Sequence, residues 1–166
     1  LISNENTIIG NTVLYGATSG KLFAAGLAGD RFAVRNSGAT TVIEGCDSNG
    51  CEYMTGGTVV ILGEVGDNFA AGMTGGMAFI YDKTLQFEKK VNPDSVIWQN
   101  VETDYWKTFL KKLVIEHLNE TGSELSKRII KNYEEEINNF VQVCPKEMLN
   151  KLKNPISFRK EVKKVS

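Results

Sequence analysis

The sequence predicts a mainly β protein: a single-stranded, right-handed parallel β-helix followed by a C-terminal α-helical extension. Three observations predict this architecture. Fifteen of the 16 glycines lie between Gly10 and Gly76, so the two halves of the 166-residue chain differ in fold. The tetrapeptide MTGG occurs at 54–57 and again at 73–76, a step of 19 residues. The residues after each copy favour β-strands, and such a repeat is typical of stacked turns.

The 19-residue step extends over four segments. They are VLYGATSGKLFAAG from Val13, FAVRNSGATTVIEG from Phe32, CEYMTGGTVVILGE from Cys51 and AAGMTGGMAFIYDK from Ala70. Two adjacent columns contain only small residues and predict a tight corner in every segment: Thr18, Ser37, Gly56 and Gly75, then Ser19, Gly38, Gly57 and Gly76. Two columns just after the corner predict a strand: Leu22, Thr41, Val60 and Phe79, then Phe23, Val42, Ile61 and Ile80.

A strand and a corner that recur in register cannot bury their apolar face alone, so successive segments must stack as turns of a coil. Each strand would pair with the same strand of the next turn, about 4.8 Å away. A β-sandwich with ordinary turns stays an alternative for a segment rich in Gly, Val and Ile. A left-handed coil of hexapeptides is disfavoured, because three hexapeptides give a step of 18 residues and not 19.

Charge divides the chain at the same place as glycine. Residues 1–88 contain 4 Lys/Arg and 9 Asp/Glu, net −5, whereas residues 89–166 contain 15 and 11, net +4, which sums to −1. We therefore assign residues 1–90 to the β-helix, with a boundary near Asn92 and Pro93, and residues 91–166 to a helical extension.

The extension shows two apolar stripes and several helix signals. The stripe within 101–119 recurs at steps of three and four residues and comprises Tyr105, Trp106, Phe109, Leu110, Leu113, Val114 and Leu118. Thr121 and Glu124 resemble a capping box that begins a second helix from Leu125 to Phe140, turning back at Gly122. Pro145 can begin a third helix that runs to Leu152 and stops at Asn154-Pro155. The basic end, 158–166, is expected to be solvated.

Composition excludes several classes of protein. No apolar run approaches the roughly 20 residues of a membrane-spanning helix, and the first residues lack the layout of a signal peptide. A net charge of −1 argues against a nucleic-acid partner. Three cysteines favour a reducing compartment, so we expect a cytoplasmic protein without a disulfide framework. Because the chain begins with Leu1, we expect a piece of a longer protein whose upstream coils are missing.

The candidates for metal or cofactor chemistry have stronger structural interpretations. Cys46 and Cys51 are spaced C-x4-C, and Cys144 follows some 90 residues later. In the repeat Cys51 shares a column with Val13, Phe32 and Ala70, as a small apolar residue, while Cys46 falls in an irregular turn. The runs GLAG at 26–29 and GEVGDNFAAG at 63–72 suggest phosphate-binding loops, but strands are expected after them instead of the helix that such loops need.

Five charged or titratable residues complete the candidates. Asp30 and Asp67 precede Phe-Ala pairs, which favours turn capping, with interdomain ion pairs as the alternative for both and for Arg31 and Arg35. His117 is the only histidine and has no neighbouring metal ligand in sequence, which favours a packing or helix-terminal role. The sequence therefore predicts no catalytic, cofactor-binding or metal-binding residue in this segment.

The first half resembles the C-terminal GXGXG domain of the glutamate synthase large (alpha) chain, a parallel β-helix. The likeness rests on YGATSG at 15–20, GDRFAVRNSGA at 29–39, GCEYMTGG at 50–57 and NFAAGMTGG at 68–76. His117 and the segment TGSELSKRIIKNYEEEINNFVQVCPKEM at 121–148 resemble the helical extension that ends those chains.

The resemblance implies that the intact enzyme makes glutamate from glutamine and 2-oxoglutarate, using FMN and an iron–sulfur cluster held by other domains. It implies that this segment is a non-catalytic scaffold that holds the amidotransferase and synthase domains, its partners, in place. Two alternatives are a structural subunit of another redox complex, such as formylmethanofuran dehydrogenase, and an enzyme that uses the β-helix flank as a cleft. We also expect the isolated chain to self-associate through an unpaired coil end.

Overall fold

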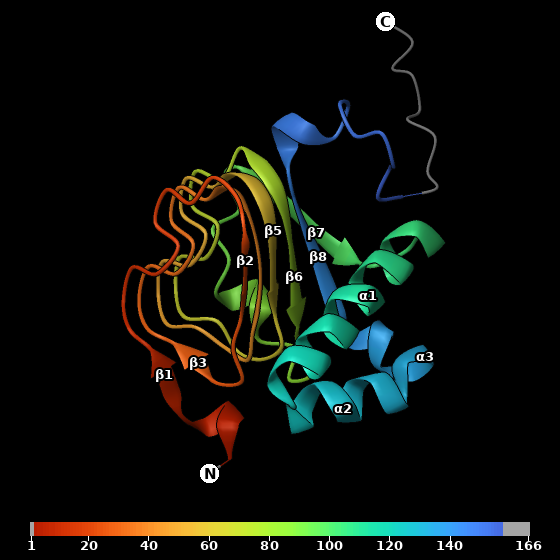
Figure 1. The fold of residues 1–166 in the computed structure, drawn as a ribbon. Helices are drawn as coiled ribbons and strands as arrows, with labels where there is room; N and C mark the ends of the chain where they lie inside the picture. The colour runs from red at the N-terminus through yellow and green to blue at the C-terminus, as the bar shows by residue number, and fades with distance from the viewer. Residues whose placement is uncertain (1, 158–166) are drawn as a thin grey trace, which may run out of the picture.

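A computed structural model describes residues 2–157, and Figure 1 shows it as a rod of stacked turns with helices packed along one side. The predicted mainly β class and parallel solenoid are confirmed. The predicted basic end at 158–166 lies outside the described residues.

Two parallel sheets run along the rod. The larger has the strand order β2-β4-β5-β6-β8-β7, with parallel pairing from β2 to β6 and antiparallel pairing of β8 with β6 and β7. The smaller pairs β1 with β3 and continues as single bridges from Ala28 to Cys46 and on to Val65. The strands are β1 (Thr7–Ile9), β2 (Lys21–Phe23), β3 (Leu27–Ala28), β4 (Ser37–Ile43), β5 (Thr55–Ile61), β6 (Gly75–Tyr81), β7 (Val96–Asn100) and β8 (Phe140–Pro145).

The helices occupy the second half of the chain, apart from two short 3-10 turns. The α-helices are α1 (Asp104–Thr121), α2 (Glu124–Lys131) and α3 (Tyr133–Glu136), and the 3-10 turns are η1 (Ser3–Glu5), η2 (Phe87–Lys89), η3 (Ile137–Asn139) and η4 (Lys146–Met148). No helix among residues 2–157 is long and apolar enough to cross a bilayer.

The register of the coil differs by one residue from the predicted columns. Lys21 pairs with Thr40 and Thr58 with Met77, steps of 19 residues, but Thr40 pairs with Thr58, a step of 18. The columns predicted to contain Val42 with Ile61, and Thr41 with Val60, are therefore wrong. The observed ladders are Phe23, Val42, Val60 and Phe79; Leu22, Thr41, Val59 and Ala78; and Ile43, Ile61 and Ile80.

The same shift moves Gly38 out of the predicted line with Gly57 and Gly76. A Cβ built on Gly57 would lie 2.4 Å from the carbonyl oxygen of Ala39, so Ala39 and not Gly38 lies next to Gly57. Gly57 and Gly76 have φ of 85° and 79°, in the left-handed region where a Cβ is strained. The predicted tight corner is confirmed for both of its reasons, positive φ and close backbone contact.

Opposite the larger sheet, each turn contains alternating residues of positive φ. Three columns share this conformation: Thr12, Arg31, Asn49 and Asn68; Leu14, Ala33, Cys51 and Ala70; and Gly16, Arg35, Tyr53 and Gly72. Their amides bond to carbonyls of neighbouring turns, as from Ala33 to Val13 and from Cys51 to Phe32. Cys51 therefore belongs with Ala33 and not, as predicted, with Phe32, although its role as a small apolar residue is confirmed.

The strands of the larger sheet bury side chains on both faces. The ladder of Ile43, Ile61 and Ile80 points into the coil with Met54 and Phe69. The ladder of Val42, Val60 and Phe79 points out and is covered by the extension. The residues of α1 that pack in this outer cluster are Trp106, Leu110, Leu113 and Val114. Four of the residues in the predicted stripe on 101–119 thus form the buried face of α1, which lies on the flank of the rod and not on its end (Figure 1).

The extension differs from the prediction in three places. The cap of α2 is Ser123, whose Oγ accepts from the amide of Ser126, whereas Thr121 ends α1 and bonds the carbonyl of His117. The predicted second helix is wrong at Phe140, which begins β8. After Pro145 the chain forms only the single turn η4, and strands β7 and β8 were not anticipated. The last coil strand is therefore covered by β8, because an open strand edge gains a full ladder of backbone hydrogen bonds there.

Candidate functional site

The three cysteines are buried free thiols in separate apolar positions. Cys46 lies in a regular ladder between Ala28 and Val65, so the prediction that it falls in an irregular turn is wrong. Burial raises the pKa of Cys46 to about 12 and that of Cys144 to about 11, and it raises the pKa of Cys51 well above its ordinary value. These thiols are protonated at neutral pH and are poor nucleophiles. Within residues 2–157 no three His, Cys, Asp or Glu side chains are grouped so as to hold a metal ion.

The two glycine-rich runs lie in turns of the coil. The run at 26–29 forms β3 and its approach, and the run at 63–72 connects β5 to β6, so no helix begins directly after either. A Cβ on Gly66 would lie 2.3 Å from the amide nitrogen of Ser48 in the turn below. The close approach of successive turns accounts for this glycine without a phosphate ligand.

The predicted charged candidates make contacts within the coil. Asp30 accepts a hydrogen bond from the amide of Ser48 at 3.1 Å, which is a capping bond between successive turns. Asp67 Oδ1 accepts from Lys90 Nζ at 2.9 Å. Arg35 and Arg31 are exposed, and the guanidinium of Arg35 lies 5.8 Å from the ring centre of Tyr15.

His117 joins the coil to two helices. It is fully buried; its Nδ1 lies 2.6 Å from Ser126 Oγ of α2 and its Nε2 lies 2.8 Å from the carbonyl oxygen of Ala24, just after β2. Because a carbonyl only accepts, Nε2 donates to Ala24 and Nδ1 accepts from the hydroxyl. Burial lowers the pKa of His117 below its ordinary value, outweighing the Ala24 bond and the nearby charge of Glu44. The contacts are those of a packing residue.

Sequence reasoning missed Glu44. This residue follows β4 and is 1% exposed. Its Oε1 accepts from Ser123 Oγ at 2.5 Å, and its Oε2 is buried with no hydrogen-bond partner. In the observed register Glu44 is aligned with Leu62 and Tyr81, the residues next after the Ile43, Ile61 and Ile80 ladder. A carboxylate in an otherwise apolar column was the signal available in the sequence, but it appears only once the one-residue shift is known.

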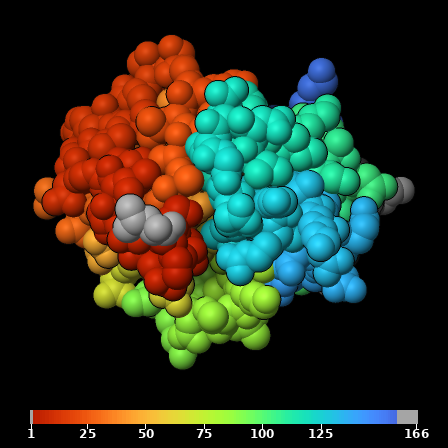
Figure 2. Space-filling view, turned by 60° about the horizontal axis from the view of Figure 1, so that its bottom comes forward, coloured from red at the N-terminus to blue at the C-terminus, as the bar shows by residue number. Residues whose placement is uncertain are grey.

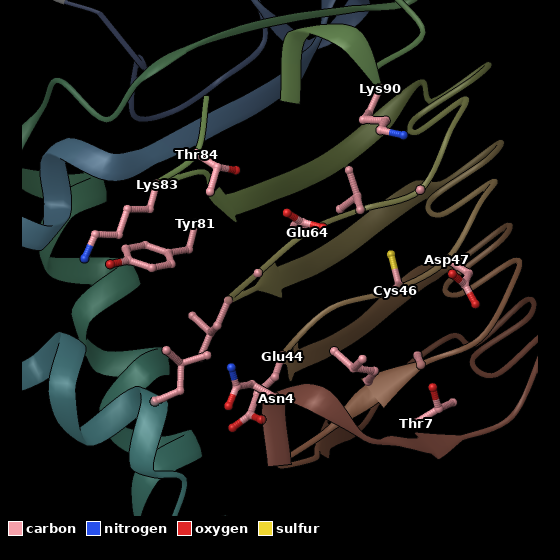
Figure 3. Close-up of a pocket in the computed structure, with 17 residues that line it drawn as sticks. Asn4, Thr7, Glu44, Cys46, Asp47, Glu64, Tyr81, Lys83, Thr84 and Lys90 are labelled. Carbon is pink, nitrogen blue, oxygen red and sulfur yellow. The ribbon is translucent and has the colours of Figure 1, made fainter. Parts of the chain in front are cut away.

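Glu44 lines a groove of about 580 Å³ at the corner where β4, β5 and β6 end. Figure 3 shows Glu44, Asp47 and Glu64 along it, with Asn4 and Thr7 on one side and Tyr81 and Lys83 on another. Figure 2 shows the end of the molecule where the N-terminal segment, the helices and the chain after β6 meet. A half-open, carboxylate-lined groove suits binding of a hydrogen-bond donor, and Cys46 in its lining is too weakly acidic to serve as a nucleophile.

The chain was compared with protein families and with curated proteins. The model of the GXGXG motif family matches residues 1–146. The large chain of the NADPH glutamate synthase of Azospirillum brasilense is 60% identical over 162 residues, which cover 98% of this chain and 11% of that protein. The NADH glutamate synthase of Schizosaccharomyces pombe is 47% identical over 161 residues, 97% of this chain and 8% of that protein.

A third relative has a different named electron donor. The ferredoxin-dependent glutamate synthase 2 of Synechocystis sp. is 47% identical over 141 residues, 85% of this chain and 9% of that protein. The chain thus spans about a tenth of the length of the curated relatives it matches. The predicted resemblance to the GXGXG domain of glutamate synthase large chains is confirmed, and the chain belongs to the GXGXG motif family.

Proposed function

We propose that this segment is the non-catalytic scaffold domain of a cytoplasmic glutamate synthase and holds its amidotransferase and FMN/iron–sulfur synthase domains together. The intact enzyme would make glutamate from glutamine and 2-oxoglutarate, with FMN and the iron–sulfur cluster held outside this segment. The observation that carries the proposal is the similarity over 98% of this chain to about a tenth of a glutamate synthase large chain. A subunit of formylmethanofuran dehydrogenase is not favoured, because the relatives found are glutamate synthases.

The architecture supports a structural role. A rod whose core continues through its turns is rigid along its length and presents long flanks to neighbouring domains. Its thiols are buried, Asp30 and Asp67 are engaged within the coil, and His117 links helices to coil. We propose residues 1–90 as the coil unit and residues 91–166 as its extension, which shares the sheet through β8.

The test uses the intact large chain and measures three activities: glutamine hydrolysis, 2-oxoglutarate reduction with supplied ammonia, and the coupled reaction. Loosening the rod with Gly57→Val is expected to lower the coupled rate at least about tenfold, while each partial activity stays within about threefold. Conservative changes of the candidate polar residues, such as Asp30→Asn and Arg35→Gln, serve as matched controls and should leave all three rates unchanged. A partial reaction abolished by one of these controls would contradict a non-catalytic role.

A further inference from the structure

The groove beside Glu44 lies where three successive turns leave the larger sheet. Its lining comes from Glu44–Asp47, from Leu62–Gly66 and from the chain after Tyr81, closed on one side by Leu125 of α2. A second pocket of about 350 Å³ shares Glu64, Tyr81 and Lys90 with it, so the two form one continuous groove. The hollow is large enough for one or two long side chains of a bound polypeptide.

Glu44 is the only carboxylate among the buried residues of the described chain, and one of its oxygens has no donor. The other buried groups of this region are satisfied: Asn36 bonds Ala39, Thr41 bonds the carbonyl of Leu22, and His117 uses both ring nitrogens. A buried carboxylate oxygen without a hydrogen bond costs roughly 1–3 kcal/mol or more. An N–H donor from outside the segment removes this penalty.

The charges of the lining select a cation. Glu44, Asp47 and Glu64 face Lys83 and Lys90, but the ammonium of Lys90 already donates to Asp67 at 2.9 Å. The carboxylate end of the groove is therefore short of positive charge. Leu27, Leu62 and Leu125 line the same hollow, and the aliphatic stem of an arginine or lysine packs well on such a surface.

We propose that this groove receives a basic side chain from another domain of the large chain, and that Glu44 Oε2 is its carboxylate partner. The inference rests on the proposed function, because the curated relatives contain about nine-tenths of their length outside the matched region. It adds to that function a specific contact, a charge-assisted hydrogen bond buried between the coil and its neighbour.

The occupant can be identified by site-specific photo-crosslinking in the intact large chain. A benzoylphenylalanine at Glu64, which is exposed and lines the groove, is expected to crosslink to a segment outside this region that contains an arginine or lysine. The matched control places the same group at Glu88, an exposed acid on η2 outside the groove. Crosslinks from Glu64 only within this segment, to a second copy or to no protein would overturn the proposal.

The role of Glu44 itself is tested by Glu44→Gln, which keeps the acceptor for Ser123 but removes the charge. Protection of the groove against hydrogen exchange in the intact chain is expected to fall about tenfold, and the effect should vanish when the crosslinked basic residue is also neutralised. Glu88→Gln should change nothing. If Glu44→Gln leaves protection unchanged while other flanks still crosslink to neighbouring domains, the groove proposal fails alone. If no position of the segment crosslinks to another domain, the proposed function fails as well.

Discussion

At the scale of single residues, the coil depends on positions where a side chain cannot fit. Gly57 combines a φ of 85° with backbone atoms of the preceding turn 2.4 Å from the site of a Cβ. The stacking distance of a parallel ladder leaves no room for relaxation there, because moving one turn away breaks its hydrogen bonds with the next. Small residues in these columns therefore follow from stacking and do not need a ligand to explain them.

Gly57→Val is expected to destabilise the chain by about 3–5 kcal/mol, because it adds backbone strain to a clash with Ala39. The adjacent change Thr58→Val is the matched control and should alter the free energy of unfolding by about 1 kcal/mol or less. Urea denaturation followed by circular dichroism measures both. Equal losses for the two variants would contradict the importance of the small column.

At the scale of elements, a buried polar network fixes the helices on the flank of the rod. The amide of Ser126 donates to Ser123 Oγ, whose hydroxyl donates to Glu44, and Ser126 Oγ donates to His117, which in turn donates to Ala24. Since hydrogen bonds depend on direction, this network specifies how α1 and α2 sit on the outer ladder, which apolar packing alone does not fix.

The network predicts a pH dependence of stability. His117 is neutral in the fold with a pKa below its ordinary value of 6.5, so the unfolded chain binds a proton more readily. The free energy of unfolding is therefore expected to fall as the pH drops below about 6.5, until the pH reaches the lowered pKa of the folded state. His117→Gln removes this titration, and chemical denaturation at about pH 7.5 and about pH 5.5 should show a smaller difference for the variant than for the parent. A larger difference in the variant would show that other groups govern acid sensitivity.

At the scale of the whole molecule, the two ends of the rod are treated differently. The last coil strand, β6, is covered by β8 and then β7, whereas β1 and β2 each pair on one side only within the described residues. Ile8 of β1 is 59% exposed beside this edge. Unpaired strand edges with apolar side chains tend to pair with other chains.

The isolated 166-residue chain is accordingly expected to self-associate through its first turn. Ile8→Lys places a charge at that edge and should shift the chain toward monomer in sedimentation velocity at high concentration. Leu85→Lys, which changes another apolar residue that is 78% exposed, should leave association unchanged. A monomeric parent chain, or an equal response to both changes, would contradict assembly through the open end.

The sequence by itself determined the period of the coil, its tight corners and the buried stripe of α1. These features depend on residues close together in the chain, and they repeat in each turn. Only the tertiary structure decided the one-residue shift between β4 and β5, the docking of β8 on β6 and the burial of Glu44. Ala78 pairs with Val143, some 65 positions along the chain, and no local periodicity specifies such a pair. It forms because folding leaves one strand edge open, and satisfying that edge also closes the flank around the unpaired carboxylate oxygen.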